Sequence, residues 1–81
     1  MPYIKHHRRD DIDLGSLPSN SGELNYLLTT LCHEYWSFNR SNYQAFNDII
    51  GALEGCKLEL YRRRVAPYED EKIKENGDVE F

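Results

Sequence analysis

Residues 21–38, SGELNYLLTTLCHEYWSF, decide the fold. Apolar residues recur in this stretch at intervals of three and four, which is typical of an amphipathic helix. Asn20 and Glu23 lie three residues apart and form a candidate capping pair, with Ser21 as a competing cap. We therefore predict a helix over residues 21–38. Its apolar positions are Leu24, Leu27, Leu28, Leu31, Cys32, Tyr35 and Trp36.

Residues 42–65, NYQAFNDIIGALEGCKLELYRRRV, carry a second apolar stripe. Ser41 and Gln44 have the spacing of a capping box at its start. Pro67 disfavours helical geometry at the residue before it, so the helix over 42–65 should stop or kink there. Because the connection between the two helices is short, we expect a mainly α fold built on an antiparallel helical hairpin.

The flanking segments complete one small α-helical domain over residues 1–81. Residues 1–20 are an N-terminal arm and loop, in which residues 5–14 predict one or two helical turns ended by Gly15. Residues 67–81 are an acidic tail that can form a helix as far as Asn76 and Gly77. Residues 2–4 and 78–81 are extended in pattern, which favours a tiny sheet or packing onto the hairpin.

The composition excludes several classes of protein. The 81 residues are 40% apolar and 30% charged, with too many aromatic residues for a disordered chain. No apolar run approaches the ~18–20 residues needed to span a bilayer, and the first residues lack the apolar stretch of a signal peptide. The net charge of −4 disfavours a nucleic-acid coat. We therefore expect a cytoplasmic protein with no membrane contact.

The helices carry more apolar surface than one hairpin can bury, which predicts a homodimer or a higher symmetric oligomer. Gly51 and Gly55 lie four residues apart on one face of the longer helix and permit another group to approach closely. Three occupants of this face are open: Trp36 or Tyr35 of the first helix, a second subunit, or a ligand.

The sequence lacks the residue patterns of catalysis and metal binding. Cys32 and Cys56 fall on the apolar stripes of neighbouring helices, where reduced thiols behave as small apolar side chains. The histidines have no nucleophile or metal-ligand spacing beside them, and no GxSxG, HExxH, CxxC or P-loop pattern occurs. We expect no enzyme activity, no metal and no cofactor.

Arginines flanked by tyrosines are the candidate binding residues, because an arginine beside an aromatic ring can hold a phosphate while the ring stacks a base. The alternative is self-pairing, since residues 69–80 hold six carboxylates against two lysines and Asp10, Asp11 and Asp13 follow the arginines of the arm. The acidic tail also disfavours long nucleic acid as a ligand. The candidates are Arg62, Arg63, Arg64, Tyr61, Tyr68, Arg8 and Arg9.

Several short strings carry a family resemblance: MPYI at 1–4, RRDDID at 8–13, GELNY at 22–26, IIGALEGCKLELYRRR at 49–64, PYEDEKI at 67–73 and ENGDV at 75–79. In this order they resemble a family of small uncharacterised proteins from tailed phages and bacteria. The resemblance covers nearly the whole chain and brings no catalytic residue or cofactor. It implies expression in the cytoplasm, that of the host if the chain is phage-encoded, and an accessory role exerted by binding.

The leading hypothesis is a non-catalytic interaction protein that binds and modulates a host or phage protein. Aromatic residues and arginine are enriched at binding hot spots, which favours a protein partner. The alternative is an anti-defence protein that sequesters a small anionic nucleotide between subunits. In that case the arginines would grip the phosphates while a tyrosine or Trp36 stacks the base. A third hypothesis is a purely structural assembly factor.

Overall fold

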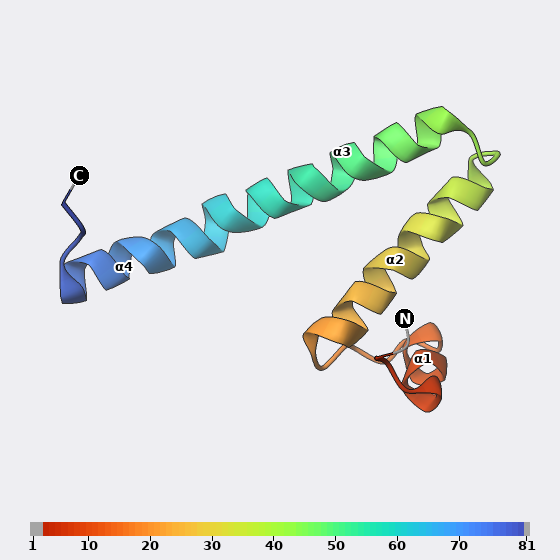
Figure 1. Ribbon diagram of the computed structural model, residues 1–81, viewed down its shortest axis with the longest axis horizontal. Coiled ribbons are helices and arrows are strands. Elements are labelled where there is room, and N and C mark those ends of the chain that lie inside the picture. Colours follow the sequence, from red (N-terminus) through yellow and green to blue (C-terminus); the bar gives the residue numbers. More distant parts are fainter. Residues whose placement is uncertain (1–2, 81) are drawn as a thin grey trace. The chain divides into compact units, whose positions relative to one another are not determined.

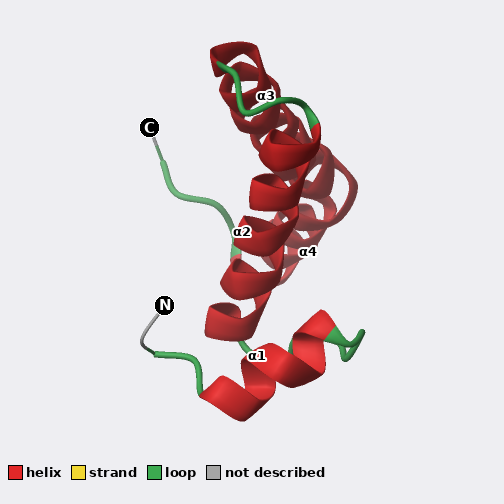
Figure 2. Ribbon diagram, turned by 90° about the vertical axis from the view of Figure 1, so that its right-hand side faces the viewer, coloured by secondary structure: helices red, strands yellow, loops and turns green. Residues whose placement is uncertain are grey.

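A computed structural model describes residues 3–80 of the chain (Figure 1). The helices are α1 (His6–Asp13), α2 (Ser21–Phe38), α3 (Tyr43–Leu60), the π-helical segment η1 (Tyr61–Val65) and α4 (Ala66–Asn76). The described residues contain no strand (Figure 2), which confirms the prediction of a mainly α protein. The chain divides into two compact units, residues 1–46 and 47–81. One domain and an antiparallel hairpin stay predictions.

The short helix α1 ends in a Schellman motif. The Ser16 N–H donates to the Asp11 carbonyl at 3.0 Å, and the Gly15 N–H donates to the Ile12 carbonyl at 3.0 Å. Gly15 has φ 109, a left-handed conformation that glycine adopts without the steric cost of a Cβ. The prediction that Gly15 ends this helix is confirmed.

Asparagines cap the starts of α2 and α3. The Asn20 side chain accepts a hydrogen bond from the Glu23 N–H at 2.9 Å, and the Asn42 side chain accepts one from the Ala45 N–H at 2.8 Å. The first cap and the bounds 21–38 are as predicted. The second cap corrects the prediction of Ser41, because Ser41 has φ 51 whereas an N-cap residue is extended.

The end of α2 repeats the Schellman motif with a different residue in the left-handed position. The Ser41 N–H donates to the Trp36 carbonyl at 2.9 Å, and the Arg40 N–H donates to the Ser37 carbonyl at 3.3 Å. Arg40 has φ 68 at the position that glycine usually occupies. The Trp36 ring stacks on Phe46 with 5.0 Å between ring centroids and an interplanar angle of 11°. This turn therefore holds the end of α2 against the start of α3.

The helix that begins at Tyr43 does not stop before Pro67. The Ala66 N–H donates to the Tyr61 carbonyl five residues earlier, and α4 follows directly from Ala66. Proline has no N–H and its ring clashes with the carbonyl four residues before it in an α-helix, here that of Arg63. A π turn spaces its hydrogen bonds five residues apart and relieves this conflict. Of the two predicted outcomes, a stop or a kink, the stop is therefore not found, and the helix changes its hydrogen bonding instead. The boundary of the tail at residue 67 stays a prediction.

The C-terminal end of α4 agrees with its prediction. The Gly77 N–H donates to the Ile73 carbonyl at 2.7 Å, and Gly77 has φ 77. Residues 78–80 follow without regular structure, so the predicted strand does not form in the described part of the chain. A lone extended segment without a pairing partner is not stable as a strand. Two further members of that predicted sheet, Pro2 and Phe81, lie outside the described residues.

The N-terminal unit has a small core where α1 lies across α2 (Figure 2). The apolar side chains of Ile4 and Ile12 are buried in the N-terminal residues, with Ile12 3% exposed, and Ala45 is buried separately at the start of α3. A Cβ on Gly22 would come within 3.1 Å of the Tyr3 ring, so Tyr3 rests on the first turn of α2. The N-terminal residues thus pack onto the helix.

The C-terminal unit has no comparable core, since none of the described residues from 47 to 80 is buried. Helices in proteins draw most of their stability from packing of an apolar face, and within this unit the described residues bury none.

We predict that Arg40→Gly stabilises the protein by about 1 kcal/mol, because glycine removes the steric cost of a side chain in the left-handed conformation. Urea unfolding followed by circular dichroism measures the change. Arg40→Ala is the matched control: it removes the charge but retains the Cβ, and should give no gain. Equal stabilisation by both variants would contradict this account of the turn.

Candidate functional site

A pairing between Arg8 of α1 and Glu23 of α2 joins the two helices of the N-terminal unit. Arg8 Nη2 lies 2.7 Å from Glu23 Oε1, and Arg8 Nε lies 3.0 Å from Glu23 Oε2. The guanidinium therefore donates in bidentate fashion, the strongest geometry for an arginine–carboxylate pair. The Glu23 residue is 6% exposed. This ion pair is thus shielded from water and holds α1 on α2.

Loop residues complete the hydrogen bonding of the Glu23 carboxylate. Ser19 donates to Oε1 from its N–H and its hydroxyl, each at 3.0 Å, and the Asn20 side-chain amide donates to Oε2 at 3.3 Å. The bonds from Arg8, followed by the Ser19 N–H, lower the pKa of Glu23 to about 2. The sequence pattern predicted that Glu23 takes part in capping α2. It did not predict that the Glu23 carboxylate also pairs with Arg8 and accepts hydrogen bonds from Ser19.

The two arginines of the N-terminal arm differ in their availability. Arg8 is committed to Glu23 and to Asp11, which lies 3.3 Å from Nη1. Arg9 has a buried Nε with no hydrogen-bond partner among the described residues, and it lines a shallow hollow beside Tyr26 and His33. The self-pairing predicted for the arm is therefore found at Arg8.

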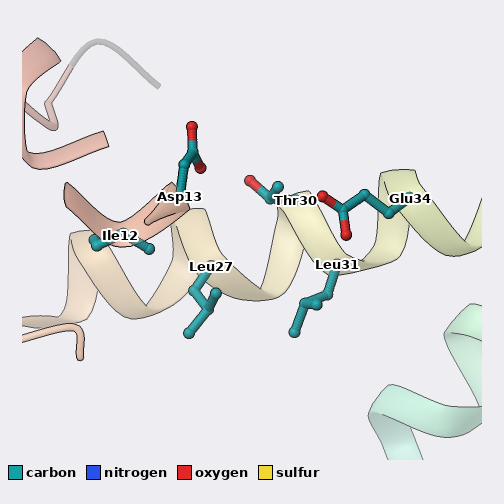
Figure 3. Close-up of a pocket in the computed structure, with 6 residues that line it drawn as sticks. All are labelled: Ile12, Asp13, Leu27, Thr30, Leu31 and Glu34. Atoms are coloured by element: carbon teal, nitrogen blue, oxygen red, sulfur yellow. The ribbon is translucent and has the colours of Figure 1, made fainter. Parts of the chain in front are cut away.

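A groove between α1 and α2 combines apolar and acidic side chains (Figure 3). Its volume is about 410 Å³. The Tyr26 hydroxyl donates to both Asp13 carboxylate oxygens, at 2.9 and 3.1 Å, which raises the pKa of the Tyr26 phenol and fixes Asp13 at the edge. The periodicity of the sequence placed Leu27 and Leu31 on the apolar face of α2. It did not show that α1 packs against α2. The lining residues are Ile12, Asp13, Leu27, Thr30, Leu31 and Glu34.

An apolar stripe runs along the helices of the C-terminal unit. Its first four members follow each other at intervals of four, three and four residues, which places them on one face of α3. The next member, Val65, follows Leu60 by five residues, the hydrogen-bond spacing of the π-helical segment, so the stripe continues into α4. We call this surface the stripe; it consists of Ile49, Leu53, Cys56, Leu60, Val65 and Tyr68.

The three consecutive arginines do not share one environment. Arg62 and Arg63 both bond Glu59, one turn earlier, rather than the acidic tail that the sequence predicted as their partner. Arg64 forms no ion pair among the described residues, and it lies four residues after Leu60, beside the stripe. Arg64 is therefore the member of the cluster that is available to a partner.

The two tyrosines that flank the arginines each interact with a charged side chain of α4. The Tyr61 hydroxyl donates to Glu69, which raises the pKa of the Tyr61 phenol. The Tyr68 ring is 62% exposed, and the Lys72 ammonium lies 5.5 Å from its centroid. Tyr68 thus offers an aromatic face with a cation already beside it.

The glycines of α3 face open space: a Cβ on Gly51 or Gly55 meets no described atom within 4 Å. Trp36 stacks on Phe46. Close packing on the glycine face stays a prediction. Both cysteines are free thiols, with Cys32 partly buried and Cys56 exposed.

Among residues 3–80, no three His, Cys, Asp or Glu side chains lie close enough together to hold a metal ion. None of the helices in this part of the chain combines the length and apolar character that crossing a membrane requires.

These features define a small α-helical protein with an anchored N-terminal helix pair and an exposed apolar–basic helix. The chain belongs to the family described as a domain of unknown function (DUF6899), which matches residues 1–79. Family membership agrees with the resemblance to a family of small uncharacterised proteins. No curated protein and no solved structure matches the chain.

We predict that acid destabilises the N-terminal unit through Glu23. Because its pKa is about 2 in the folded chain and ordinarily 4.5, ionised Glu23 stabilises the fold fully above about pH 4.5. This contribution is lost as the pH falls from 4.5 to about 2. Melting temperatures recorded between pH 2 and 7 should show this loss, and Glu23→Gln should start lower at pH 7 and lose less over that range.

Glu80→Gln is the control, since Glu80 is an exposed glutamate outside the helices of the N-terminal unit. It should retain the wild-type acid dependence. If Glu23→Gln and wild type lose stability in parallel, Glu23 is not the group responsible.

Proposed function

We propose that this chain is a non-catalytic accessory protein that binds and modulates another protein, of the host or of the phage, in the host cytoplasm. The observation that carries the proposal is the stripe, which exposes large apolar side chains along the second unit while no described residue from 47 to 80 is buried. Contiguous exposed apolar surface marks interaction sites in soluble proteins.

The residues around the stripe support a protein as the partner. Tyr68 is exposed, and Arg64 adds a charge that self-pairing does not consume. Aromatic residues and arginine beside aliphatic ones are the usual composition of a binding hot spot. Arg63, which follows Leu60 by three residues and is held by Glu59, then forms part of a polar rim.

The alternative proposal is that a small anionic nucleotide is held between subunits. Fewer arginines are free to bind its phosphates than the sequence indicates. Arg8 is committed to Glu23, and Arg62 and Arg63 to Glu59. The observation that favours it is Arg9, whose unpartnered Nε lies beside a hollow with His33. Thermal shift with mono-, di- and cyclic nucleotides tests it: stabilisation that Arg9→Ala abolishes supports this alternative.

The stripe also suits self-association. A small helical chain with uncovered apolar surface is commonly stabilised by a second copy, most often about a two-fold axis. We propose that the accessory protein is a homo-oligomer, and native mass spectrometry of the protein purified from its own host reports its copy number.

We predict that Leu60→Asp abolishes partner binding while Leu58→Asp retains it. Both leucines are 58% exposed, but they lie two residues apart and so face opposite sides of the helix, with Leu60 alone on the stripe. Affinity purification with a tagged full-length chain, quantified by mass spectrometry, compares the two variants. Circular dichroism checks that both remain helical. Equal retention of partners by both variants would remove the stripe from the proposal.

A further inference from the structure

The geometry points to a specific contact between copies of this chain: the groove between α1 and α2 receives Leu60 of the stripe and the adjacent Arg64 from a second copy. This inference rests on the proposed function, since it names a partner of the same surface. It assigns a role to the groove, which the proposed function leaves without one.

The groove offers two kinds of partner group. Leu27 and Leu31 project from one side of α2, and Asp13 projects from the end of α1 at the other edge (Figure 3). Glu34 closes the same groove one turn beyond Thr30. An occupant must therefore combine an apolar side chain with a cation.

The segment from Leu60 to Tyr68 supplies that combination. Leu60, Arg64 and Tyr68 follow at intervals of four residues and lie along one side of the helix. The aliphatic stem of an arginine packs on apolar surface while its guanidinium reaches a carboxylate. Arg64 has no ion pair among the described residues, whereas its two neighbours already share Glu59.

The carboxylates of the groove are available to Arg64. Asp13 accepts hydrogen bonds from the Tyr26 hydroxyl and, as an anion, can accept more. Glu34 is exposed and forms no ion pair with any described residue. Asp13 and Glu34 thus lie on one side of the groove and the two leucines on the other (Figure 3), and Arg64 supplies the matching positive side chain beside Leu60. Opposite charges placed across an interface fix its register.

Charge complementarity favours a second copy as the occupant, because the groove carries the carboxylates of Asp13 and Glu34 and the segment that begins at Leu60 carries Arg64. Two copies related by a two-fold axis form the contact twice, so both grooves and both arginines are used.

Charge exchange between Glu34 and Arg64 tests the contact in the full-length chain. We expect wild type to be a dimer by analytical ultracentrifugation, and Glu34→Lys or Arg64→Glu alone to raise the dissociation constant at least about tenfold. The double variant should dimerise again. An equimolar mixture of the two single variants should also form dimers. In each mixed pair the introduced lysine of one chain faces the introduced glutamate of the other, and the remaining Arg64 faces the remaining Glu34.

Arg62→Glu is the matched control, because it makes the same charge change two residues from Arg64 on the other side of the helix. It should leave the dissociation constant within about twofold of wild type. Circular dichroism of every variant separates lost contact from lost helix.

Each other outcome overturns the inference in a distinguishable way. If the single variants dimerise like wild type, the chain associates through another surface, and the proposed function stands. Rescue by the double variant without rescue by the mixture would place the contact within one chain. A monomeric wild type that still retains its partner through Leu60 would leave the proposed function intact and remove this contact.

Discussion

The Glu23 carboxylate holds the N-terminal unit together. Helix α1 has eight residues, too few to persist alone in water, and its first turn carries no acidic residue to stabilise it. Arg8 ties it to α2, and the same carboxylate binds the loop through Ser19. Burial of Ile12 and the groove beside it both follow from this anchoring, since they exist only while α1 lies on α2.

The two units differ in the interactions that stabilise them. The N-terminal unit buries few apolar side chains and supplements them with a shielded ion pair whose lone pairs are well satisfied, which is the condition for such a pair to be tolerated. The C-terminal unit has abundant apolar side chains and nothing of its own to cover them. The N-terminal unit is therefore held by its own contacts, whereas the C-terminal unit leaves its apolar side chains exposed to interact with another molecule.

Local signals in the sequence predicted what local interactions determine. The bounds of α2 follow from its periodicity and from Asn20, and the ends at Gly15 and Gly77 follow from the freedom of glycine in left-handed backbone. The start of α3 was predicted one residue too early because Ser41 and Asn42 are both good caps, and only the backbone conformation distinguishes them. Pro67 does not end the helix because the π turn before it relieves the conflict that proline creates with α-helical hydrogen bonding.

The features of the candidate sites that the sequence did not predict depend on contacts between residues far apart in the sequence. Arg8 and Glu23 are fifteen positions apart, beyond any helical or strand period. The groove requires α1 to meet α2, so its carboxylates could not be grouped from spacing alone. The arginine run, in contrast, was visible as a cluster, and the four-residue spacing of Glu59 and Arg63 favours their pairing. Spacing alone did not show that Glu59 would also bond Arg62.

The π-helical segment also sets the rotational phase of everything after it. One residue corresponds to about 100° of helix rotation, so deleting a single residue between Tyr61 and Val65 would turn the rest of the helix by that amount. Tyr68 would then leave the line of Leu60 although no contact residue had changed. The length of this one turn therefore decides in which direction the side chains of α4 point relative to those of α3.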